Sequence, residues 1–251
     1  MEKSQWNSIL VFADGACKGN PGPGGFGAIV VTPDGWVKEL GGGDRHTTNN
    51  RMELMGVIAA LEWLATKPGA IDIHTDSTYV IRGITQWVWA WRNRDWKTAE
   101  GKDVLNVELW KRMLAALAKR GPKSKEAPIN WHYVRGHTGV PGNERCDEIS
   151  VNYATSGRSK LYDGPLLQYG IAIHDVPEDT SLPDMRPKAE KVAAHSYLSL
   201  LGSTPMRHSS WAECERRVKG QSGAKFKKAT SAADEAKILS SWGYKPGDVK
   251  N

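Results

Sequence analysis

Cysteine is scarce in this sequence, and its cysteines stand far apart. Cys17, Cys146 and Cys214 are the only three among 251 residues, and no two of them form a CxxC pair. A disulfide framework or a zinc ribbon needs closely spaced cysteines, so both are excluded and reduced thiols are expected.

Long apolar runs are also missing. No stretch approaches 18 consecutive apolar residues, and the first ten residues hold no apolar run of signal-peptide length. We therefore expect no membrane span, no contact with a membrane and no secretion, and we place the protein in the cytoplasm.

Positive charge and tryptophan are what the sequence has in excess. The net charge is +6, and residues 195–251 hold ten Lys and Arg against five Asp and Glu, a local net charge of +5. The stretch WVWAWRNRDWK at 87–97 places four tryptophans beside three basic residues: Trp87, Trp89, Trp91, Trp96, Arg92, Arg94 and Lys97. Some of these rings could be core, but basic charge mixed with aromatic surface favours a nucleic-acid partner.

Hydrophobic periodicity predicts an α/β domain over residues 1–155. The expected strands are 8–15, 26–32, 36–40, 70–76 and 129–136, and the expected helices begin at Asn49 and cover parts of 77–88, 104–120 and 143–155. This order predicts a five-stranded mixed sheet flanked by helices. Residues 156–194 are rich in proline and mixed charge, which predicts a linker. Residues 195–251 are expected to form a second, small α+β domain.

A glycine-rich stretch follows the first expected strand. GPGGFG at 22–27 fits the GxGxxG pattern of dinucleotide sites, but a strand follows it where such a site needs a helix N-terminus. We therefore interpret the stretch as a turn and expect no dinucleotide cofactor.

Four carboxylates occupy the ends of elements that could meet at one sheet edge. Asp14 and Asp76 end apolar strands, Glu53 lies one turn into a helix, and Asp147 lies in the first turns of the last helix. Each could be a cap or an ion pair. Together they suit hard divalent cations with oxygen ligands, Mg²⁺ or Mn²⁺, and two such ions about 4 Å apart are a recurrent device for cutting phosphodiesters.

Longer strings of sequence resemble a known family. FADGACKGNPGPGGFGAI, TTNNRMELMGVIAALEWL, HTDSTYVIRGITQWVWAWRNRDWKT and VRGHTGVPGNERCDE resemble, in order, the signature segments of type 1 ribonuclease H in its bacterial form. The resemblance covers roughly residues 8–155. It implies a ribonuclease H-like fold and an endonuclease that hydrolyses the RNA strand of RNA–DNA hybrids, leaving 5′-phosphate and 3′-hydroxyl ends.

The resemblance also implies roles for single residues. Two Mg²⁺ ions, with Mn²⁺ as a substitute, would be bound by Asp14, Glu53, Asp76 and Asp147, and His137 would be the catalytic histidine. Polar contacts to the substrate would come from Asn20, Thr48, Asn49 and Asn50. A basic handle on the DNA strand would include Trp87, Trp91, Arg92, Arg94 and Lys97. Thr78 and His46 depart from the common family pattern, at positions where many relatives have glutamine and a basic residue.

The C-terminal residues resemble a second module. SYLSLL, WAEC and GAKFKK are similar to the small hybrid-binding domain, of the viroplasmin type, found at the N-terminus of many ribonucleases H. The resemblance implies aromatic contacts from Tyr197, Trp211 and Phe226 and phosphate contacts from Lys227 and Lys228. The alternative is a small helical tail whose lysines are merely solvated.

Two other functions remain open. A DNA nuclease or junction resolvase of related fold lacks the TTNNRMEL string and the tryptophan handle, and a non-catalytic hybrid-binding protein would have lost at least one of the four acids. We expect a monomeric enzyme whose partner is an RNA–DNA hybrid.

Overall fold

The computed structural model describes residues 7–120, 127–184 and 194–250. The chain divides into two compact units, Met1–Pro183 and Asp184–Asn251. Each unit has its own sheet and its own apolar core, so each is described by itself.

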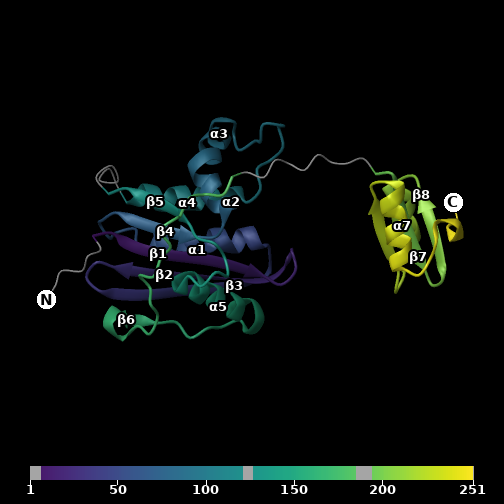
Figure 1. Ribbon diagram of the computed structural model, residues 1–251. Coiled ribbons are helices and arrows are strands. Elements are labelled where there is room, and N and C mark those ends of the chain that lie inside the picture. Colours follow the sequence, from purple (N-terminus) through teal and green to yellow (C-terminus); the bar gives the residue numbers. More distant parts are fainter. Residues whose placement is uncertain (1–6, 121–126, 185–193, 251) are drawn as a thin grey trace. The chain divides into compact units, whose positions relative to one another are not determined.

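The first unit is built on a six-stranded mixed sheet with the strand order β5-β4-β1-β2-β3-β6 (Figure 1). Its strands are β1 (Ile9–Cys17), β2 (Gly22–Thr32), β3 (Trp36–Thr47), β4 (Ile71–Thr75), β5 (Ile129–Tyr133) and β6 (Asp163–Pro165). β1, β2 and β3 form an antiparallel meander, while β4 lies parallel to both β1 and β5. The predicted mixed sheet is confirmed, but its strand number is six, because β6 pairs with the outer edge of β3.

Helices cover both faces of this sheet. They are α1 (Asn49–Trp63), α2 (Thr78–Arg82), the π-helical turn η1 (Gly83–Trp87), α3 (Val88–Asn93), α4 (Val107–Lys119) and α5 (Pro141–Ser156). Side chains alternate along β1, so Val11 points into the core formed with α1 and α4, and Phe12 points into a second core beside α5. β1 is buried on both faces for this reason, as its apolar sequence predicts.

The glycines at 22–27 form the start of β2 and not a turn, which corrects the prediction from sequence. A Cβ atom on Gly25 would lie 2.3 Å from the carbonyl oxygen of Ser150, and one on Gly27 would lie 2.4 Å from that of Cys146. These glycines therefore let α5 pack directly on the backbone of the sheet. The turn itself is confined to residues 18–21.

Residues 157–183, which we call the strap, belong to the first unit, although the sequence predicted a linker from 156. The strap contributes β6 and the short helix η3 (Leu166–Gln168), and it buries Ile173 at 2% exposure in the core beside α5. Its apolar residues are too widely spaced to show a helical or strand period, which is why composition suggested a linker. The rest of the predicted linker, 185–193, lies outside the described residues.

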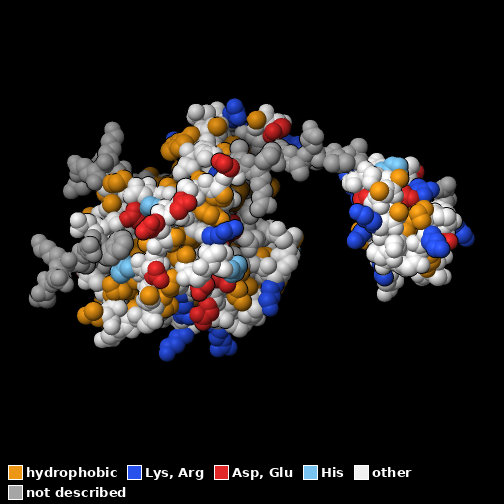
Figure 2. Space-filling view, viewed as in Figure 1, with side chains coloured by type: hydrophobic (Ala, Val, Ile, Leu, Met, Phe, Trp, Pro, Cys, Tyr) orange, Lys and Arg blue, Asp and Glu red, His pale blue; other side chains and the backbone are white. Residues whose placement is uncertain are grey.

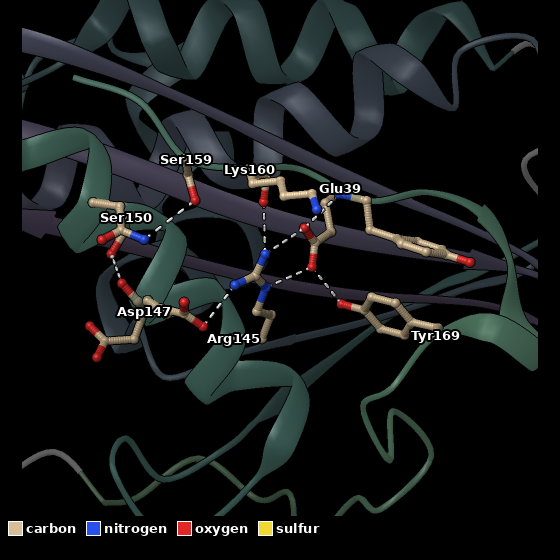
Figure 3. A network of polar contacts seen from close by, with 10 residues as sticks. Glu39, Arg145, Asp147, Ser150, Ser159, Lys160 and Tyr169 are labelled. Carbon is tan, nitrogen blue, oxygen red and sulfur yellow. Dashed lines mark hydrogen bonds and ion pairs between the residues drawn. The ribbon is translucent and has the colours of Figure 1, made fainter. Parts of the chain in front are cut away.

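A buried carboxylate joins the strap to β3 and α5 (Figure 3). Glu39 of β3 is 1% exposed and accepts two hydrogen bonds from the Arg145 guanidinium, at 2.8 and 2.9 Å. The Tyr169 hydroxyl and the Tyr162 N–H of the strap also donate to Glu39, at 2.7 and 2.8 Å. Burial of this charge is thus compensated by four donors.

The second unit is a three-stranded antiparallel sheet with two helices, which confirms the predicted small α+β domain. Its elements are β7 (Ser196–Leu201), β8 (Thr204–His208), α6 (Trp211–Val218), β9 (Lys225–Ala229), α7 (Ala232–Ser241) and the short helix η4 (Pro246–Asp248). Leu198, Ala229, Ile238 and Leu239 form its core. Across both units, none of the helices in the described residues has the length and apolar character needed to span a membrane.

Candidate active site

The four candidate carboxylates meet at one edge of the first sheet. β1 and β4 are parallel neighbours with Phe12 level with His74, so Asp14 and Asp76, two residues further on, come level with each other where β4 ends. Contrary to the prediction from sequence, Asp14 does not end its strand, because β1 continues to Cys17. Glu53 reaches the same edge from the first turns of α1, and Asp147 reaches it from α5. All four line one pocket of about 330 Å³, together with Asn49, Cys17 and His137.

Burial and mutual repulsion disfavour the charged forms of Asp14, Glu53 and Asp76. Asp14 is 6% exposed, and its pKa is raised from 3.8 to about 8, by burial first and then by the charges of Asp76, Asp147 and Glu53. The Gly15 N–H, 2.6 Å from Oδ1 of Asp14, opposes this shift. Burial also raises the pKa of Glu53 and of Asp76. Ionisation of all four acids would therefore place more negative charge in the pocket than its own donors compensate.

Two neighbours orient Glu53, and one of them was not assigned from sequence. The Asn49 side-chain amide donates to Oε1 of Glu53 at 2.8 Å, and the Ser77 hydroxyl donates to Oε2. Ser77 is also the N-cap of α2, since its oxygen accepts from the Val80 N–H at 3.2 Å. A serine directly before a helix is a recognisable cap signal, but its second role toward Glu53 depends on tertiary contact.

Asn143 of α5 is a second residue that sequence reasoning missed. Its side chain is buried and hydrogen-bonds Asp76. Burial raises the pKa of Asp76, and the charge of His137 and this hydrogen bond from Asn143 both act to lower it. Its Oδ1 atom has no protein partner among the described residues. In the sequence, only its place in the polar stretch PGNERCDE, close to Asp147, indicated that Asn143 could belong to the site.

His137 lies at the mouth of the pocket. Its side chain is 80% exposed, its Nδ1 is 3.9 Å from Oδ2 of Asp147, and its backbone has a positive φ of 55°. Gly136, just before it, lies against Asp76. The ring thus lies close to the carboxylates while most of its surface faces solvent.

The four candidate substrate contacts lie at the start of α1 and in the β1–β2 turn, and Asn49 among them lines the pocket. The Asn49 N–H donates to the Asn20 side-chain oxygen at 3.4 Å, which joins the two segments. Thr48 is the N-cap residue of α1, and its hydroxyl makes no capping bond. Asn20 and Asn50 are exposed. Polar groups therefore face solvent on this side of the carboxylates.

The tryptophan-rich stretch serves partly as core. Trp87 and Trp91 are half-buried with ring centroids 5.6 Å apart, and Trp91 also contacts the buried Trp110 at 5.7 Å. Trp96 packs against the same core, while Trp89 is 54% exposed. Among the candidate basic contacts, Arg92 and Arg94 are exposed, and Lys97 forms an ion pair with Asp103. The basic surface of the handle is therefore carried chiefly by the two arginines.

In the second unit the structure brings three candidate aromatic side chains together. Trp211 at the start of α6 lies 5.9 Å from Tyr197 and 5.4 Å from Phe226, measured between ring centroids. Exposed Trp211 and Phe226 make this an apolar surface that faces water.

Strand alternation separates the two candidate lysines. Lys228 is paired with Tyr197 and lies two residues from Phe226, so it shares their face of the sheet. Lys227 is paired with the core residue Leu198 and lies on the opposite face. There it helps lower the pKa of Asp234, which the Thr230 N–H and hydroxyl lower most.

The donor set of the pocket fits hard divalent cations. Its acids supply only oxygen ligands, and the raised pKa values of Asp14, Glu53 and Asp76 show that their ionised forms are disfavoured, which a cation would compensate. Within residues 7–120, 127–184 and 194–250, no three His, Cys, Asp or Glu side chains are grouped so as to hold one ion alone.

Comparison with known proteins agrees with this geometry. The RNase H family profile matches residues 6–155, and the Ribonuclease H1 N-terminal domain profile matches residues 202–237. A ribonuclease H of Bradyrhizobium diazoefficiens is 52% identical over 142 residues, covering 57% of this chain and 86% of the relative. A ribonuclease H of Cupriavidus metallidurans is 51% identical, covering 57% of this chain and 92% of the relative.

Among solved structures, the first unit is similar to a type 1 ribonuclease H with the type 2 active-site motif. That similarity has a TM-score of 0.53 and 31% identity, and it covers 64% of this chain and 80% of the other. The fold expectation of a ribonuclease H-like sheet with a small second domain is thereby confirmed. The profile match over more than half of the sequence and the relatives at about 50% identity lead to one conclusion: the chain belongs to the ribonuclease H family of enzymes.

Proposed function

We propose that this enzyme is an endonuclease that hydrolyses the RNA strand of RNA–DNA hybrids, with Asp14, Glu53, Asp76 and Asp147 as its metal-binding acids. The convergence of these four acids in one pocket, on a chain of the ribonuclease H family, carries the proposal. A related-fold DNA nuclease and a non-catalytic hybrid-binding protein are the alternatives that the experiment below separates.

The proposed cofactor is a pair of Mg²⁺ ions, with Mn²⁺ as a substitute. When bound, such ions supply Lewis-acid activation of water and phosphate and stabilise charge on the leaving oxygen. The expected products carry 5′-phosphate and 3′-hydroxyl ends. Ser77 and Asn49 hold the Glu53 carboxylate in one orientation, Asn143 hydrogen-bonds Asp76, and Gly136 leaves room for the Asp76 carboxylate.

His137 is proposed to move a proton at the mouth of the pocket or to ease release of product. Its exposed ring and its 3.9 Å distance from Asp147 support a group that approaches the reacting atoms without being held there. Imidazole is suited to this task because its ordinary pKa lies close to neutral pH.

Substrate selection is assigned to two surfaces of the first unit. The polar residues Asn20, Thr48, Asn49 and Asn50 are proposed to contact the hybrid backbone near the cut, where a 2′-hydroxyl distinguishes RNA from DNA. The handle, with Arg92 and Arg94 exposed beside half-buried Trp87 and Trp91, is proposed to hold the DNA strand through its phosphates. Lys97 adds less charge because Asp103 neutralises it.

The second unit is proposed to bind hybrid through its aromatic face. Tyr197, Trp211 and Phe226 offer stacking or sugar contacts, and Lys228 lies on the same face. A tethered second site raises apparent affinity through high effective concentration. A chain ending at residue 184 should therefore stay folded and active but bind hybrid about tenfold or more weakly, with a flatter salt dependence.

One cleavage experiment tests the proposed activity. End-labelled RNA–DNA hybrid, duplex RNA and duplex DNA are each incubated with the full chain, with and without Mg²⁺, and the products are sized on a gel. Cutting confined to the RNA of the hybrid and dependent on the ion is expected. Cutting of duplex DNA would favour the resolvase alternative, and binding without cutting would favour the non-catalytic one.

A further inference from the structure

The far end of the strap contacts both elements that lead into the carboxylate edge. The Tyr133 N–H, at the end of β5, donates to the carbonyl oxygen of Thr180 at 2.9 Å. The Thr180 hydroxyl lies 3.0 Å from Nδ1 of His132. Three residues further on, the Arg82 guanidinium, in the last turn of α2, donates to the carbonyl oxygen of Pro183. Four residues of the strap thus join β5 to α2.

The β5 contact leads directly to His137. β5 is an edge strand, so the outward-facing Tyr133 N–H has the strap as its partner in place of another strand. The next residue, Val134, donates its N–H to the Thr75 carbonyl at 3.1 Å, which keeps the chain alongside the residue before Asp76. Two residues later Gly136 touches the Asp76 carboxylate, and His137 follows. A shift at Tyr133 would therefore reach Asp76 and His137 within four residues.

The α2 contact leads to Glu53. α2 has only five residues, so it is stabilised by few internal hydrogen bonds and depends on outside contacts. Its N-cap, Ser77, immediately follows Asp76 and donates to Glu53. The Arg82 contact at the other end of α2 ties this short helix to the strap.

We propose that Thr180 and Arg82 are positioning residues that hold β5 and α2 at a fixed spacing and so place His137, Asp76 and Glu53 relative to one another. The inference rests on the proposed nuclease function. The strap lies between the two stretches that match known families, residues 6–155 and 202–237, so neither match assigns it a role. Catalytic geometry is sensitive to shifts of about 1 Å, so loosening the Thr180 and Arg82 contacts should lower kcat more than it changes KM.

The test uses the full chain with the double substitution Arg82→Gln and Thr180→Val. We expect kcat on RNA–DNA hybrid to fall by about three- to tenfold, while KM stays within about twofold, because the substrate-contacting surfaces are untouched. Hydrogen exchange at the Tyr133 amide should become faster. The conservative pair Arg82→Lys and Thr180→Ser should restore kcat. Lysine can still donate to the Pro183 carbonyl oxygen, and the serine hydroxyl can still hydrogen-bond His132.

Asp163→Asn is the matched control at the other end of the strap. Asp163 accepts hydrogen bonds from Trp36 (2.8 Å) and Lys38 (2.5 Å), far from β5 and α2, so its loss should loosen the strap without changing kcat. An unchanged kcat in the double variant would overturn the inference while leaving the nuclease function intact, and so would an equal fall of kcat in Asp163→Asn. Absence of hybrid cleavage by the wild-type chain would overturn the proposed function and this inference together.

Discussion

Gly136 lies so close to Asp76 that a Cβ atom at position 136 would be 2.4 Å from Oδ2 of Asp76. No side chain fits there unless the Asp76 carboxylate or the loop that carries His137 moves. We predict that Gly136→Ala lowers kcat on hybrid by about 10²-fold, because displacements of about 1 Å in an active site have costs of this size.

The measurement for Gly136→Ala is steady-state cleavage together with thermal unfolding. Gly139→Ala is not a matched control, because Gly139 has a positive φ of 87°, so Gly170→Ala in the strap, with open space around it, serves instead. Full activity of Gly136→Ala would show that the Asp76 carboxylate tolerates displacement.

Asp14→Asn should abolish cleavage while hybrid binding survives. Removing one of the four converging acids weakens metal binding. It also removes the cost of burying an ionised Asp14 beside the other acids, the cost that raises the pKa of Asp14 to about 8. The unfolding temperature without Mg²⁺ should therefore hold or rise. Cleavage within about tenfold of wild type would contradict the metal-ligand assignment, since a lost acid of this kind is not expected to be a minor contributor.

His137→Ala should lose activity only in part. We expect a fall of about 10²-fold, the usual contribution of a general acid–base group, because the four carboxylates stay in place. Cleavage rates of His137→Ala and Asp14→Asn are compared at one Mg²⁺ concentration. Equal losses in the two variants would mean that His137 is a ligand or a structural residue.

Lys227 and Lys228 should differ in their effect on hybrid binding. Lys228 shares the face of Tyr197 and Phe226, whereas Lys227 lies on the opposite face near Asp234. In the Asp14→Asn background, Lys228→Gln should weaken binding and lower the slope of log affinity against log salt by about one, the value for one lost phosphate contact. Lys227→Gln is the matched control, with the same charge change and a nearly unaltered slope. A larger effect from Lys227 would place the nucleic acid on the other face of the sheet.

Glu39 should contribute an acid-sensitive part of the stability of the first unit. Burial by itself would raise the pKa of Glu39, but hydrogen bonds from Arg145, Tyr169 and the Tyr162 N–H outweigh it and hold the pKa below its ordinary 4.5. A lowered pKa in the folded state means that the ionised group stabilises the fold above about pH 4.5 and that this stability is lost as pH falls through the folded-state value.

Glu39→Gln tests this contribution through urea unfolding between pH 3 and 7. We expect a loss of at most about 3–5 kcal/mol at pH 7, because Arg145 would lose its buried charged partner and keep only the exposed Glu148 as an acidic partner. The difference from wild type should shrink as pH falls below about 4.5. A difference that does not change with pH would mean that Glu39 acts through packing and not through charge.

The sequence by itself determined the elements and the chemistry of this protein. The apolar strand that contains Asp14, the strand that leads to Asp76, the helices that carry Glu53 and Asp147, and a glycine-flanked His137 could all be identified, because local pattern and spacing are properties of neighbouring residues. The sequence indicated only that these four acids could meet at one sheet edge, and the structure brings their side chains into one pocket.

Tertiary structure alone decided the rest. Ser77 and Asn143 support the acids, and the strap joins β5 to α2, through contacts between residues far apart in the chain. The glycines of β2 were misinterpreted as a turn because their role is to admit α5, which comes about 120 residues later. Lys227 and Lys228, adjacent in sequence, are separated because strand alternation sends them to opposite faces, and the register with β7 decides which face carries the aromatic side chains.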